Sequence, residues 1–255
     1  MQTRYVRFAA LGDSTTYGIG DPVPGGPGTA WRGWARLLAD AMGTAYDVSF
    51  CNLAVSGATA RCVRERQLDE ALAHRPDLAS LVVGINDTMR STWDPARLHE
   101  DLMTTAGALH DGGALLLTAR FHDHARVFGV PSVLGRPLMA RIEVVNEVYD
   151  LVHATYGGLR VDLAACPEVL DRTFWSVDRL HPSELGHRLF ARRFAELLGG
   201  EGLAFEPPSA APAGGLDPSW RRNVAWMLTE GAPWMGRRAR DLGPWAVRAA
   251  WAEAH

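Results

Sequence analysis

The sequence contains no lysine. All 26 of its lysine-plus-arginine positions are arginine, in a chain of 255 residues. Arginine stays protonated in proteins, so the chain has no side-chain amine whose pKa can be tuned. This absence excludes enzymes that form a Schiff base, phosphate-binding loops that need a lysine, and serine hydrolases that use lysine as the base.

Cysteine is also scarce, and basic charge does not exceed acidic charge. Cys51, Cys62 and Cys166 are too few and too scattered for a disulfide framework or a cysteine-rich zinc site, so we expect reduced thiols. The formal net charge of −3 lacks the basic field that nucleic-acid binding needs. We therefore expect no nucleic-acid partner.

Long hydrophobic runs are absent as well. No apolar segment approaches the roughly 20 residues that a membrane helix needs. Residues 1–8 lack the apolar stretch and the small-residue cleavage site of a signal peptide. We therefore expect a cytoplasmic protein without an integral membrane segment.

Short apolar runs alternate with longer segments of helical periodicity. We predict strands at residues 5–11, 48–53, 78–83, 114–118 and 159–163. We predict helices at residues 31–42, from Asp94-Pro95 to Gly112-Gly113, from Pro137 to Gly157-Gly158, and over 183–198. Strands this apolar favour burial on both faces. The alternation therefore predicts a parallel sheet covered by helices on both sides, a three-layer α/β/α domain.

Three stretches interrupt this alternation. Residues 18–29 are a loop rich in glycine and proline, and residues 120–136 are a connection long enough to suggest a functional loop. Residues 199–217 are rich in glycine, proline and alanine, which is typical of a linker. We thus divide the chain into a main domain (1–198), this linker, and a helical appendage (218–255) with five of the nine tryptophans and six arginines. We expect the appendage to pack its tryptophans on the main domain, with a lid or partner surface as the alternative.

Polar clusters lie where the carboxyl ends of the predicted strands meet. They are Gly12–Gly18 after the first strand, Asn52–Gly57 after the second, Gly84–Asp87 after the third, and Asp178–Pro182 before the last helix. In an open parallel sheet, ligands bind beyond the carboxyl ends of the strands. We therefore expect the four clusters to form one site.

The side chains of these clusters suit acyl transfer by an activated serine. A serine hydroxyl becomes a good nucleophile when an imidazole takes its proton, and the imidazole needs a carboxylate to fix its tautomer. Ser14, His181 and Asp178 supply these groups, and the absence of lysine leaves His181 as the candidate base. The N–H groups of Ser14 and Gly57 and the side-chain amide of Asn86 are candidates to bind the oxyanion. Such a site needs no metal or other cofactor, and its partner is a small acyl ester.

On these residues the sequence resembles the SGNH hydrolases, also called GDSL esterases and lipases, over residues 5–198. The matching blocks are Gly12-Asp13-Ser14, Gly57 after a strand, Gly84-Ile85-Asn86-Asp87, and Asp178-Arg179-Leu180-His181-Pro182. The resemblance implies a flavodoxin-like sheet with strand order 2-1-3-4-5. It also implies a triad of Ser14, His181 and Asp178, and an oxyanion hole of Ser14, Gly57 and Asn86.

Within that family the sequence looks like a cytoplasmic bacterial subgroup. Arg32-Gly33-Trp34 follows the first block, Trp175-Ser176 precedes the last, and a segment rich in tryptophan and arginine ends the chain. The leucine that is common after Gly-Asp-Ser in the family is Thr15 here, at a variable position, so the triad is not affected.

Other functions are open on the residues alone. His122-Asp123-His124 invites a metal site, but the Asp-Xaa-His and Gly-Asn-His motifs of metallophosphoesterases are absent. An α/β-hydrolase is disfavoured because Ser14 and Ser56 both lack the Gly-Xaa-Ser-Xaa-Gly pattern. Acyl transfer to an alcohol other than water would use the same residues, and a descendant that only binds an acylated ligand is a further alternative.

Other polar residues are given supporting roles. We expect Asp87 to brace its loop and His187 to be a packing or surface group on the last helix. Arginine is the only fixed cation available to recognise an anionic substrate, and Arg120, Arg126 and Arg136 on the long connection are the candidates.

Overall fold

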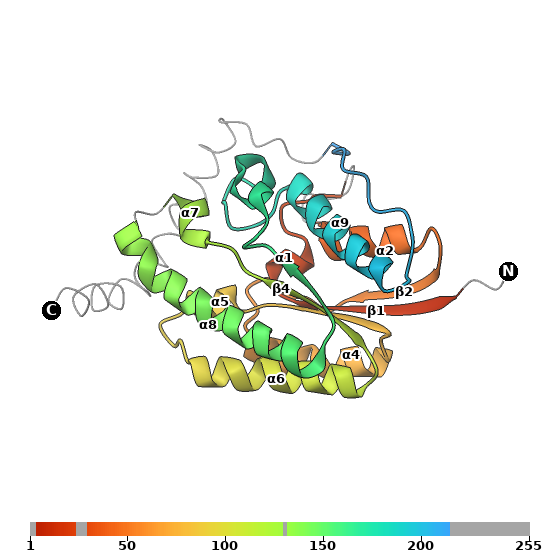
Figure 1. The fold of residues 1–255 in the computed structure, drawn as a ribbon, viewed down its shortest axis with the longest axis horizontal. Coiled ribbons are helices and arrows are strands. Elements are labelled where there is room, and N and C mark those ends of the chain that lie inside the picture. The colour runs from red at the N-terminus through yellow and green to blue at the C-terminus, as the bar shows by residue number, and fades with distance from the viewer. Residues whose placement is uncertain (1–3, 24–29, 130–131, 215–255) are drawn as a thin grey trace.

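Five strands form one parallel sheet with the order β2-β1-β3-β4-β5 (Figure 1). They are β1 (Tyr5–Gly12), β2 (Asp47–Asn52), β3 (Leu78–Val82), β4 (Leu115–Arg120) and β5 (Leu159–Asp162). The structure, a computed structural model, describes residues 4–23, 30–129 and 132–214. The appendage expected at residues 218–255 and the end of the expected linker lie outside these residues. The predicted fold class and strand order are confirmed.

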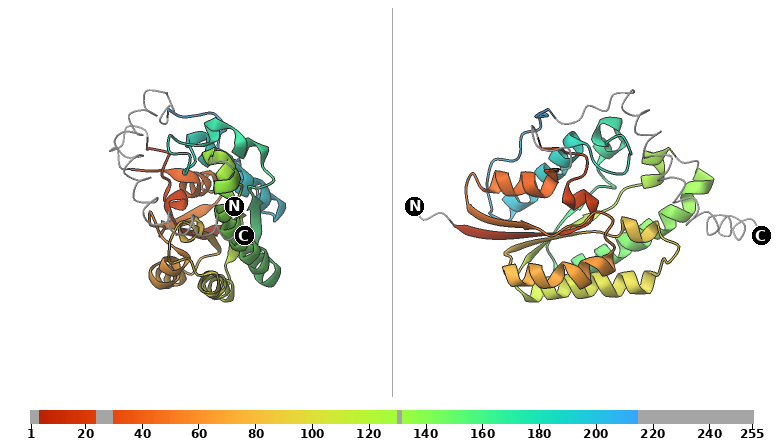
Figure 2. Two further views of the ribbon diagram at one scale, coloured as in Figure 1. Left: turned by 90° about the vertical axis from the view of Figure 1, so that its left-hand side faces the viewer. Right: turned by 180° about the vertical axis from the view of Figure 1, so that it is seen from behind.

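Helices cover both faces of this sheet (Figures 1 and 2). On one face α2 (Gly33–Met42) packs against α9 (Glu184–Gly200). The other face carries α3 (Ala60–Arg66), α4 (Leu68–His74), α6 (Pro95–Asp111) and α8 (Ser132–Tyr156). Three short helices follow strand ends, namely α1 (Ser14–Tyr17), α5 (Ile85–Thr88) and α7 (His124–Phe128), and two 3-10 turns span Pro167–Leu170 and Arg172–Phe174.

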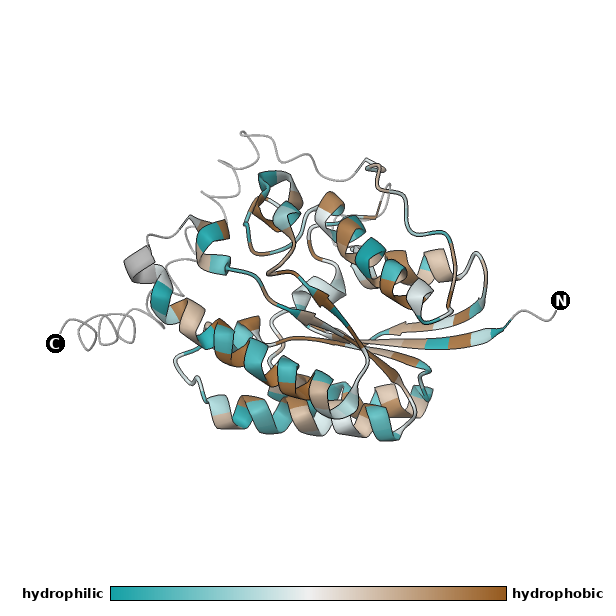
Figure 3. Ribbon diagram, in the orientation of Figure 1, coloured by the Kyte–Doolittle hydropathy of each residue, from teal (hydrophilic) through white to brown (hydrophobic). Residues whose placement is uncertain are grey.

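Hydrophobic residues concentrate in the central strands, whereas the helices alternate between hydrophilic and hydrophobic positions (Figure 3). Every residue of the central strand β3 is buried, but most of the edge strand β2 is only partly buried. A parallel strand covered on both faces has no solvent side, so an uninterrupted apolar run suits it. This burial is the reason that the strands could be predicted from short apolar runs.

Aromatic side chains fix the helices on each face. Trp34 of α2 packs against Phe190 and Phe194 of α9, with ring centroids 4.8 and 5.0 Å away, and so joins these two helices. On the other face the Tyr149 hydroxyl of α8 donates to the Val83 carbonyl oxygen (2.9 Å) and accepts from the Val83 N–H (3.0 Å). Both layers are thus fixed beside the strand ends that carry the polar clusters.

The connection after β4 is shorter than predicted. We expected a loop over residues 120–136 and a helix starting after Pro137, but α7 forms within that stretch and α8 begins at Ser132. Asp123 caps α7, since its Oδ1 accepts a hydrogen bond from Arg126 N at 2.9 Å. Pro137 lies in the second turn of α8, where it removes one backbone hydrogen bond, and the packed apolar stripe that follows maintains the helix.

Other helix ends follow the sequence signals more closely. Asp94 caps α6 by accepting from Arg97 N (3.1 Å), and Ser183 caps α9 by accepting from Gly186 N (3.2 Å). The last helix continues two residues beyond the expected Leu198. Helices α3 and α4 were not predicted, although Thr59 caps α3 by accepting from Cys62 N (3.2 Å).

The segment after α9 runs back along the domain rather than away from it. Arg188 and Arg192 of α9 donate to the carbonyl oxygens of Ser209 (2.9 Å) and Pro208 (2.8 Å). Phe205 packs edge-on against Tyr46, so this part of the expected linker is held on the main body. None of the helices within the described residues is long and apolar enough to cross a bilayer.

Candidate active site

Ser14 lies at the carboxyl end of β1, where the one-turn helix α1 begins. The chain passes close to β3 at this point, because a Cβ on Gly12 would lie only 2.5 Å from the Val82 carbonyl oxygen. Asp13 caps the turn, and its Oδ1 accepts a hydrogen bond from Thr15 N at 3.0 Å. Ser14 is thereby held at the rim of the sheet with 7% of its surface exposed.

Asp178 and His181 lie in a short closed loop before α9. Ser176 N donates to the His181 carbonyl oxygen at 2.9 Å, next to an antiparallel bridge between Trp175 and Pro182. Within the loop, Asp178 Oδ2 lies 2.5 Å from His181 Nδ1. The carboxylate and the imidazole therefore pair within one local segment, as their three-residue spacing predicted.

The Asp178 carboxylate receives three further hydrogen bonds. Its Oδ1 accepts from Ser176 Oγ (2.8 Å), Leu180 N (2.9 Å) and His181 N (3.0 Å). Burial raises the pKa of this carboxyl, but the charge and hydrogen bonds of His181, with the N–H of Leu180, outweigh burial and lower the pKa to about 2. Asp178 is therefore ionised at neutral pH and favours a proton on His181 Nδ1.

The other ring nitrogen of His181 faces the serine. His181 Nε2 lies 2.8 Å from Ser14 Oγ, across 167 positions of sequence. The structure thus joins Ser14, His181 and Asp178 in one hydrogen-bonded chain. This arrangement allows the serine proton to pass to the imidazole while the carboxylate holds the ring.

The groups predicted to bind an oxyanion lie on neighbouring turns. Asn86 of α5 donates from Nδ2 to the Ala58 carbonyl oxygen (3.1 Å) and lies 3.4 Å from Asp13 Oδ2. Gly57, next to Ala58, has a φ of +79°, a conformation that favours glycine. Within the described residues, neither Ser14 nor Gly57 uses its N–H in a hydrogen bond to another protein group.

Two carboxylates lie beside these turns, Asp13 buried and Asp87 partly buried. Burial is the main cause that raises the pKa of Asp13 to about 6 and that of Asp87 to about 7. Asp87 accepts a hydrogen bond from Ala60 N, with Oδ2 at 3.1 Å and Oδ1 at 3.3 Å. It therefore braces the start of α3, which is the supporting role expected for it. Arg90 holds the same loop from outside by donating to the Gly57 carbonyl oxygen at 3.2 Å.

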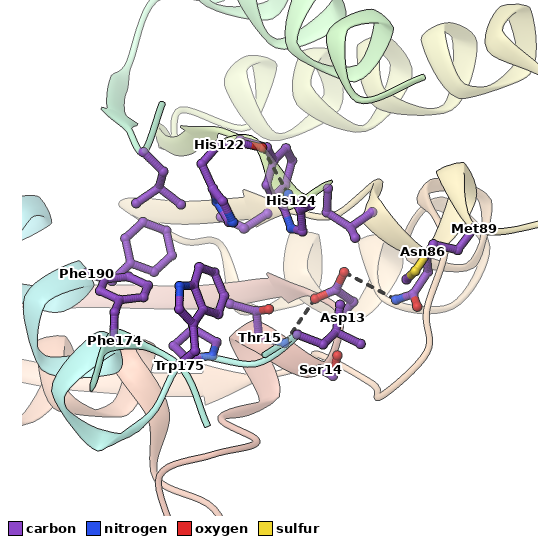
Figure 4. A pocket seen from close by; sticks show the side chains of 16 residues that line it. Asp13, Ser14, Thr15, Asn86, Met89, His122, His124, Phe174, Trp175 and Phe190 are labelled. Atoms are coloured by element: carbon purple, nitrogen blue, oxygen red, sulfur yellow. Dashed lines mark hydrogen bonds between the residues drawn. The ribbon is translucent and has the colours of Figure 1, made fainter. Parts of the chain in front are cut away.

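A small cavity of about 40 Å³ adjoins Ser14 (Figure 4). Its walls come from the ends of β1, β3 and β4, from α1 and α5, and from the residues before α9. Most of the wall is apolar, including Met89, Phe121, Phe174, Trp175 and Phe190. A cavity of this volume has room for about three water-sized groups.

His122 and His124 supply polar groups to the same wall. Their rings stack with centroids 3.9 Å apart and an angle of 18° between the planes. Burial lowers the pKa of His124 to about 4 and that of His122 well below its ordinary value, so both rings are neutral. Among the described residues, no cluster of three or more histidine, cysteine, aspartate or glutamate side chains is placed to hold a metal. The motif that invited a metal site instead forms part of the cavity wall, which sequence reasoning missed.

The arginines proposed to recognise an anionic substrate lie elsewhere. Arg120 pairs with Glu143 of α8 at 3.1 Å, and Arg126 and Arg136 are exposed. None of the three lines the cavity. The cavity itself is walled by neutral rings and aliphatic groups, with Asp13 as its ionisable carboxyl.

His187 is a packing group, one of the two roles expected for it. It is fully buried, its Nδ1 accepts from Trp34 N (3.2 Å), and its Nε2 donates to the Ile19 carbonyl oxygen (2.9 Å). Ile19 N in turn donates to the Ser14 carbonyl oxygen at 3.1 Å. His187 therefore links α9 and α2 to the turn that carries Ser14.

Comparisons with known proteins identify the family of the chain. Residues 10–189 match the model of the GDSL-like Lipase/Acylhydrolase family. The chain is 26% identical over 194 residues to an acetylxylan esterase of Geobacillus stearothermophilus, a match that covers 69% of this chain and 84% of that protein.

Solved structures share the fold. A crystal structure of an acetylxylan esterase from Geobacillus stearothermophilus superimposes with a TM-score of 0.60 at 21% identity, over 83% of this chain and 100% of that one. A lipase/acylhydrolase from Enterococcus faecalis superimposes with a TM-score of 0.61 at 22% identity, over 80% of this chain and 100% of that one. At these identities the likeness concerns the fold alone.

Proposed function

Because the chain belongs to the GDSL-like lipase/acylhydrolase family and is a carboxylic ester hydrolase, we propose that it cleaves its ester with Ser14 as the nucleophile. The observation that carries this proposal is the hydrogen-bonded chain from Ser14 Oγ through His181 to Asp178. In it, His181 is the general base and Asp178 fixes the imidazole tautomer. The reaction needs no metal or other cofactor.

The first half of the reaction forms an acyl-enzyme. Ser14 Oγ bonds to the ester carbonyl carbon while His181 Nε2 takes the hydroxyl proton, which gives a tetrahedral intermediate with a negative oxygen. The carbon–oxygen bond to the alcohol then breaks, and Nε2 gives its proton to the departing alcohol. The acyl group remains on Ser14 as an ester.

The second half returns the enzyme to its starting state. A water molecule gives one proton to His181 Nε2 and bonds to the acyl carbon through its oxygen. The second tetrahedral intermediate then releases Ser14 Oγ, which recovers the proton from Nε2. The products are one carboxylic acid and one alcohol per ester.

The negative oxygen of both intermediates would be bound by three donors. These are the N–H groups of Ser14 and Gly57 and the Nδ2 group of Asn86. Support for this assignment comes from two N–H groups that have no protein acceptor within the described residues, and from an amide held at the same rim by the Ala58 carbonyl oxygen. The amide has two N–H bonds, so it would bind the oxyanion with the one that otherwise points to Asp13 at the longer distance of 3.4 Å. The two backbone N–H groups are fixed in advance and need no reorganisation when charge develops on the oxygen.

A short acyl group fits the site best. The cavity beside Ser14 measures about 40 Å³, whereas an apolar cavity of about 150 Å³ holds benzene. The enclosed space is therefore of the size of an acetyl group and smaller than a long fatty-acyl chain. The alcohol part would lie outside it, and acetylated xylan, after which the similar esterase of Geobacillus stearothermophilus is named, is a candidate to test.

Labelling with a fluorophosphonate probe tests the nucleophile. The wild-type protein is expected to gain one covalent phosphonyl group on Ser14 and to hydrolyse p-nitrophenyl acetate, and Ser14→Ala is expected to lose both properties. Ser56→Ala is the matched control, because Ser56 is an exposed serine beside Gly57 and should leave both unchanged. Full activity in folded Ser14→Ala protein would contradict the proposal.

A further inference from the structure

Among the described residues, His122 is the buried polar side chain of the cavity wall that has no hydrogen-bond partner in the protein. Both ring nitrogens of His122 are buried and make no hydrogen bond. Other buried polar atoms within the described residues also lack partners, among them Trp34 Nε1 and Ser80 Oγ, but those residues do not line the cavity. His122 is thus distinguished by being both unpaired and placed beside the nucleophile.

Packing holds the His122 ring in one orientation. It stacks on the His124 ring, and its centroid lies 4.7 Å from the Trp175 ring centroid, which is tilted by 43°. His124 is itself fixed by the hydrogen bond of its Nδ1 to the His122 carbonyl oxygen (3.0 Å), and Trp175 by donation from Nε1 to the Val169 carbonyl oxygen (2.7 Å). In Figure 4 the two imidazoles extend from the end of β4 toward the space above Trp175.

A neutral imidazole in this position offers one donor and one acceptor. Burial keeps His122 in the neutral form, as its lowered pKa indicates. Leaving both nitrogens unpaired in an apolar wall is costly, and a phenylalanine of similar shape would avoid that cost. The two nitrogens lie on different edges of the ring, so one small group pairs with only one of them, and a hydroxyl suits either nitrogen because it can both donate and accept a hydrogen bond.

We propose that His122 forms a subsite for a short acyl group that carries a hydroxyl, of two or three carbons, such as the 2-hydroxyacetyl group. This inference rests on the proposed function, because the acyl group enters the cavity while its carbonyl carbon bonds to Ser14. The small volume of the cavity assigns it to the acyl part of the ester rather than to a sugar or other large alcohol. His122 is a specificity-determining residue here and takes no part in proton transfer to Ser14.

Two isosteric esters test the subsite. Phenyl 2-hydroxyacetate and phenyl propionate differ by a terminal hydroxyl in place of a methyl group, so the ratio of their kcat/KM values measures recognition of the hydroxyl. The ratio of their rates with hydroxide ion gives the intrinsic difference in reactivity. Relative to that ratio, the wild-type enzyme is expected to favour the hydroxyacyl ester about 2- to 12-fold, the effect of one net hydrogen bond.

Substitution of His122 should remove this preference. In His122→Phe the ratio is expected to fall to the hydroxide value while propionate hydrolysis is kept, whereas His122→Gln, which retains a donor and an acceptor, should keep part of the preference. Leu163→Met is the matched control, because Leu163 lines the same cavity without a side-chain hydrogen-bonding group and should leave the ratio unchanged.

The stability of the same variants separates recognition from a purely structural role. If the unpaired nitrogens serve the substrate, His122→Phe should raise Tm by about 2–4 °C, because it removes an unsatisfied buried group. A lower Tm with both esters slowed equally would assign His122 to structure alone and overturn the proposal.

The wild-type enzyme alone can also overturn the proposal, even where His122→Phe does not fold. A wild-type ratio equal to the hydroxide ratio would remove the subsite and leave the proposed function intact. Failure to hydrolyse either ester, together with no labelling of Ser14 by the fluorophosphonate, would overturn the proposed function and the subsite with it.

Discussion

Asp178, which is partly buried, and Asp13, which is buried, both lie at the site of Ser14, yet their surroundings have opposite effects on charge. Asp178 receives hydrogen bonds from its own loop and from the His181 ring, and its pKa lies near 2. Asp13 receives one close backbone bond from Thr15 and a longer one from Asn86, and its pKa lies near 6. The charge of His181 and the additional donors outweigh burial at Asp178, whereas burial dominates at Asp13.

The difference matches the roles that we propose. A carboxylate that orients a histidine must remain charged while the ring gains and loses a proton, and the loop around Asp178 provides that. Asp13 caps the turn at Thr15 and orients the Asn86 amide. A carboxyl that titrates near neutral pH is sufficient for both roles. From this contrast we expect substitution of Asp178 to have the largest effect, substitution of Asn86 an intermediate effect, and substitution of Asp13 the smallest.

Asp178→Asn should have the largest effect. The amide would stabilise the wrong tautomer of His181 and could not stabilise the imidazolium, so kcat for p-nitrophenyl acetate is expected to fall by about 10⁴-fold. Asp171→Asn is the control, because Asp171 is an exposed carboxylate in the same segment that caps a 3-10 turn. A loss of less than tenfold in a folded Asp178→Asn protein would remove the orienting role from Asp178.

Asn86→Ala tests the side-chain amide that lies next to Asp13 and that we propose as an oxyanion donor. If its amide binds the oxyanion, kcat should fall by about 10²–10³-fold with little change in KM, because the bond strengthens in the transition state. Asn52→Ala is a suitable control, since Asn52 on the same rim donates to the Thr16 carbonyl oxygen instead (3.0 Å). A change in kcat below threefold would count against Asn86 as an oxyanion donor.

Asp13→Asn should have the smallest effect, seen in the pH dependence of stability. A carboxyl whose pKa is raised from 3.8 to about 6 on folding binds its proton more tightly in the folded state, so its contribution to stability decreases as pH rises from 4 to 6. The two-unit shift corresponds to about 3 kcal/mol. Urea unfolding at pH 4 and pH 7 should therefore show a smaller fall in unfolding free energy for Asp13→Asn than for wild type. An equal fall in unfolding free energy in the two proteins would show that Asp13 does not cause this pH dependence.

Local signals explain how much could be predicted. The strands are short apolar runs buried on both faces, and Asp178 and His181 pair within a loop whose spacing is visible in the sequence. The strand order came from resemblance to a family, because no local pattern states which strands are neighbours. The cytoplasmic location and the division into domain, linker and appendage stay predictions.

What was missed depends on contacts between distant segments. The start of α8 was hidden by Pro137, whose usual effect is overcome by packing further along the helix. The neutral histidine pair depends on the approach of Trp175 from another part of the chain, so His122-Asp123-His124 was interpreted as a possible metal motif. The electrostatic contrast between Asp13 and Asp178 likewise depends on donors that only the folded chain assembles.

The hydrogen bonds of His187 have a consequence for motion at the site. Through Ile19 and Ser14 on one side, and through the start of α9 on the other, this residue closes a ring of contacts that contains both Ser14 and the segment that follows His181. We therefore expect fast fluctuations of the outer loops to leave the separation of Ser14 Oγ and His181 Nε2 little changed. That separation is linked to the buried contact between α2 and α9, and buried helices open locally less often than surface segments do.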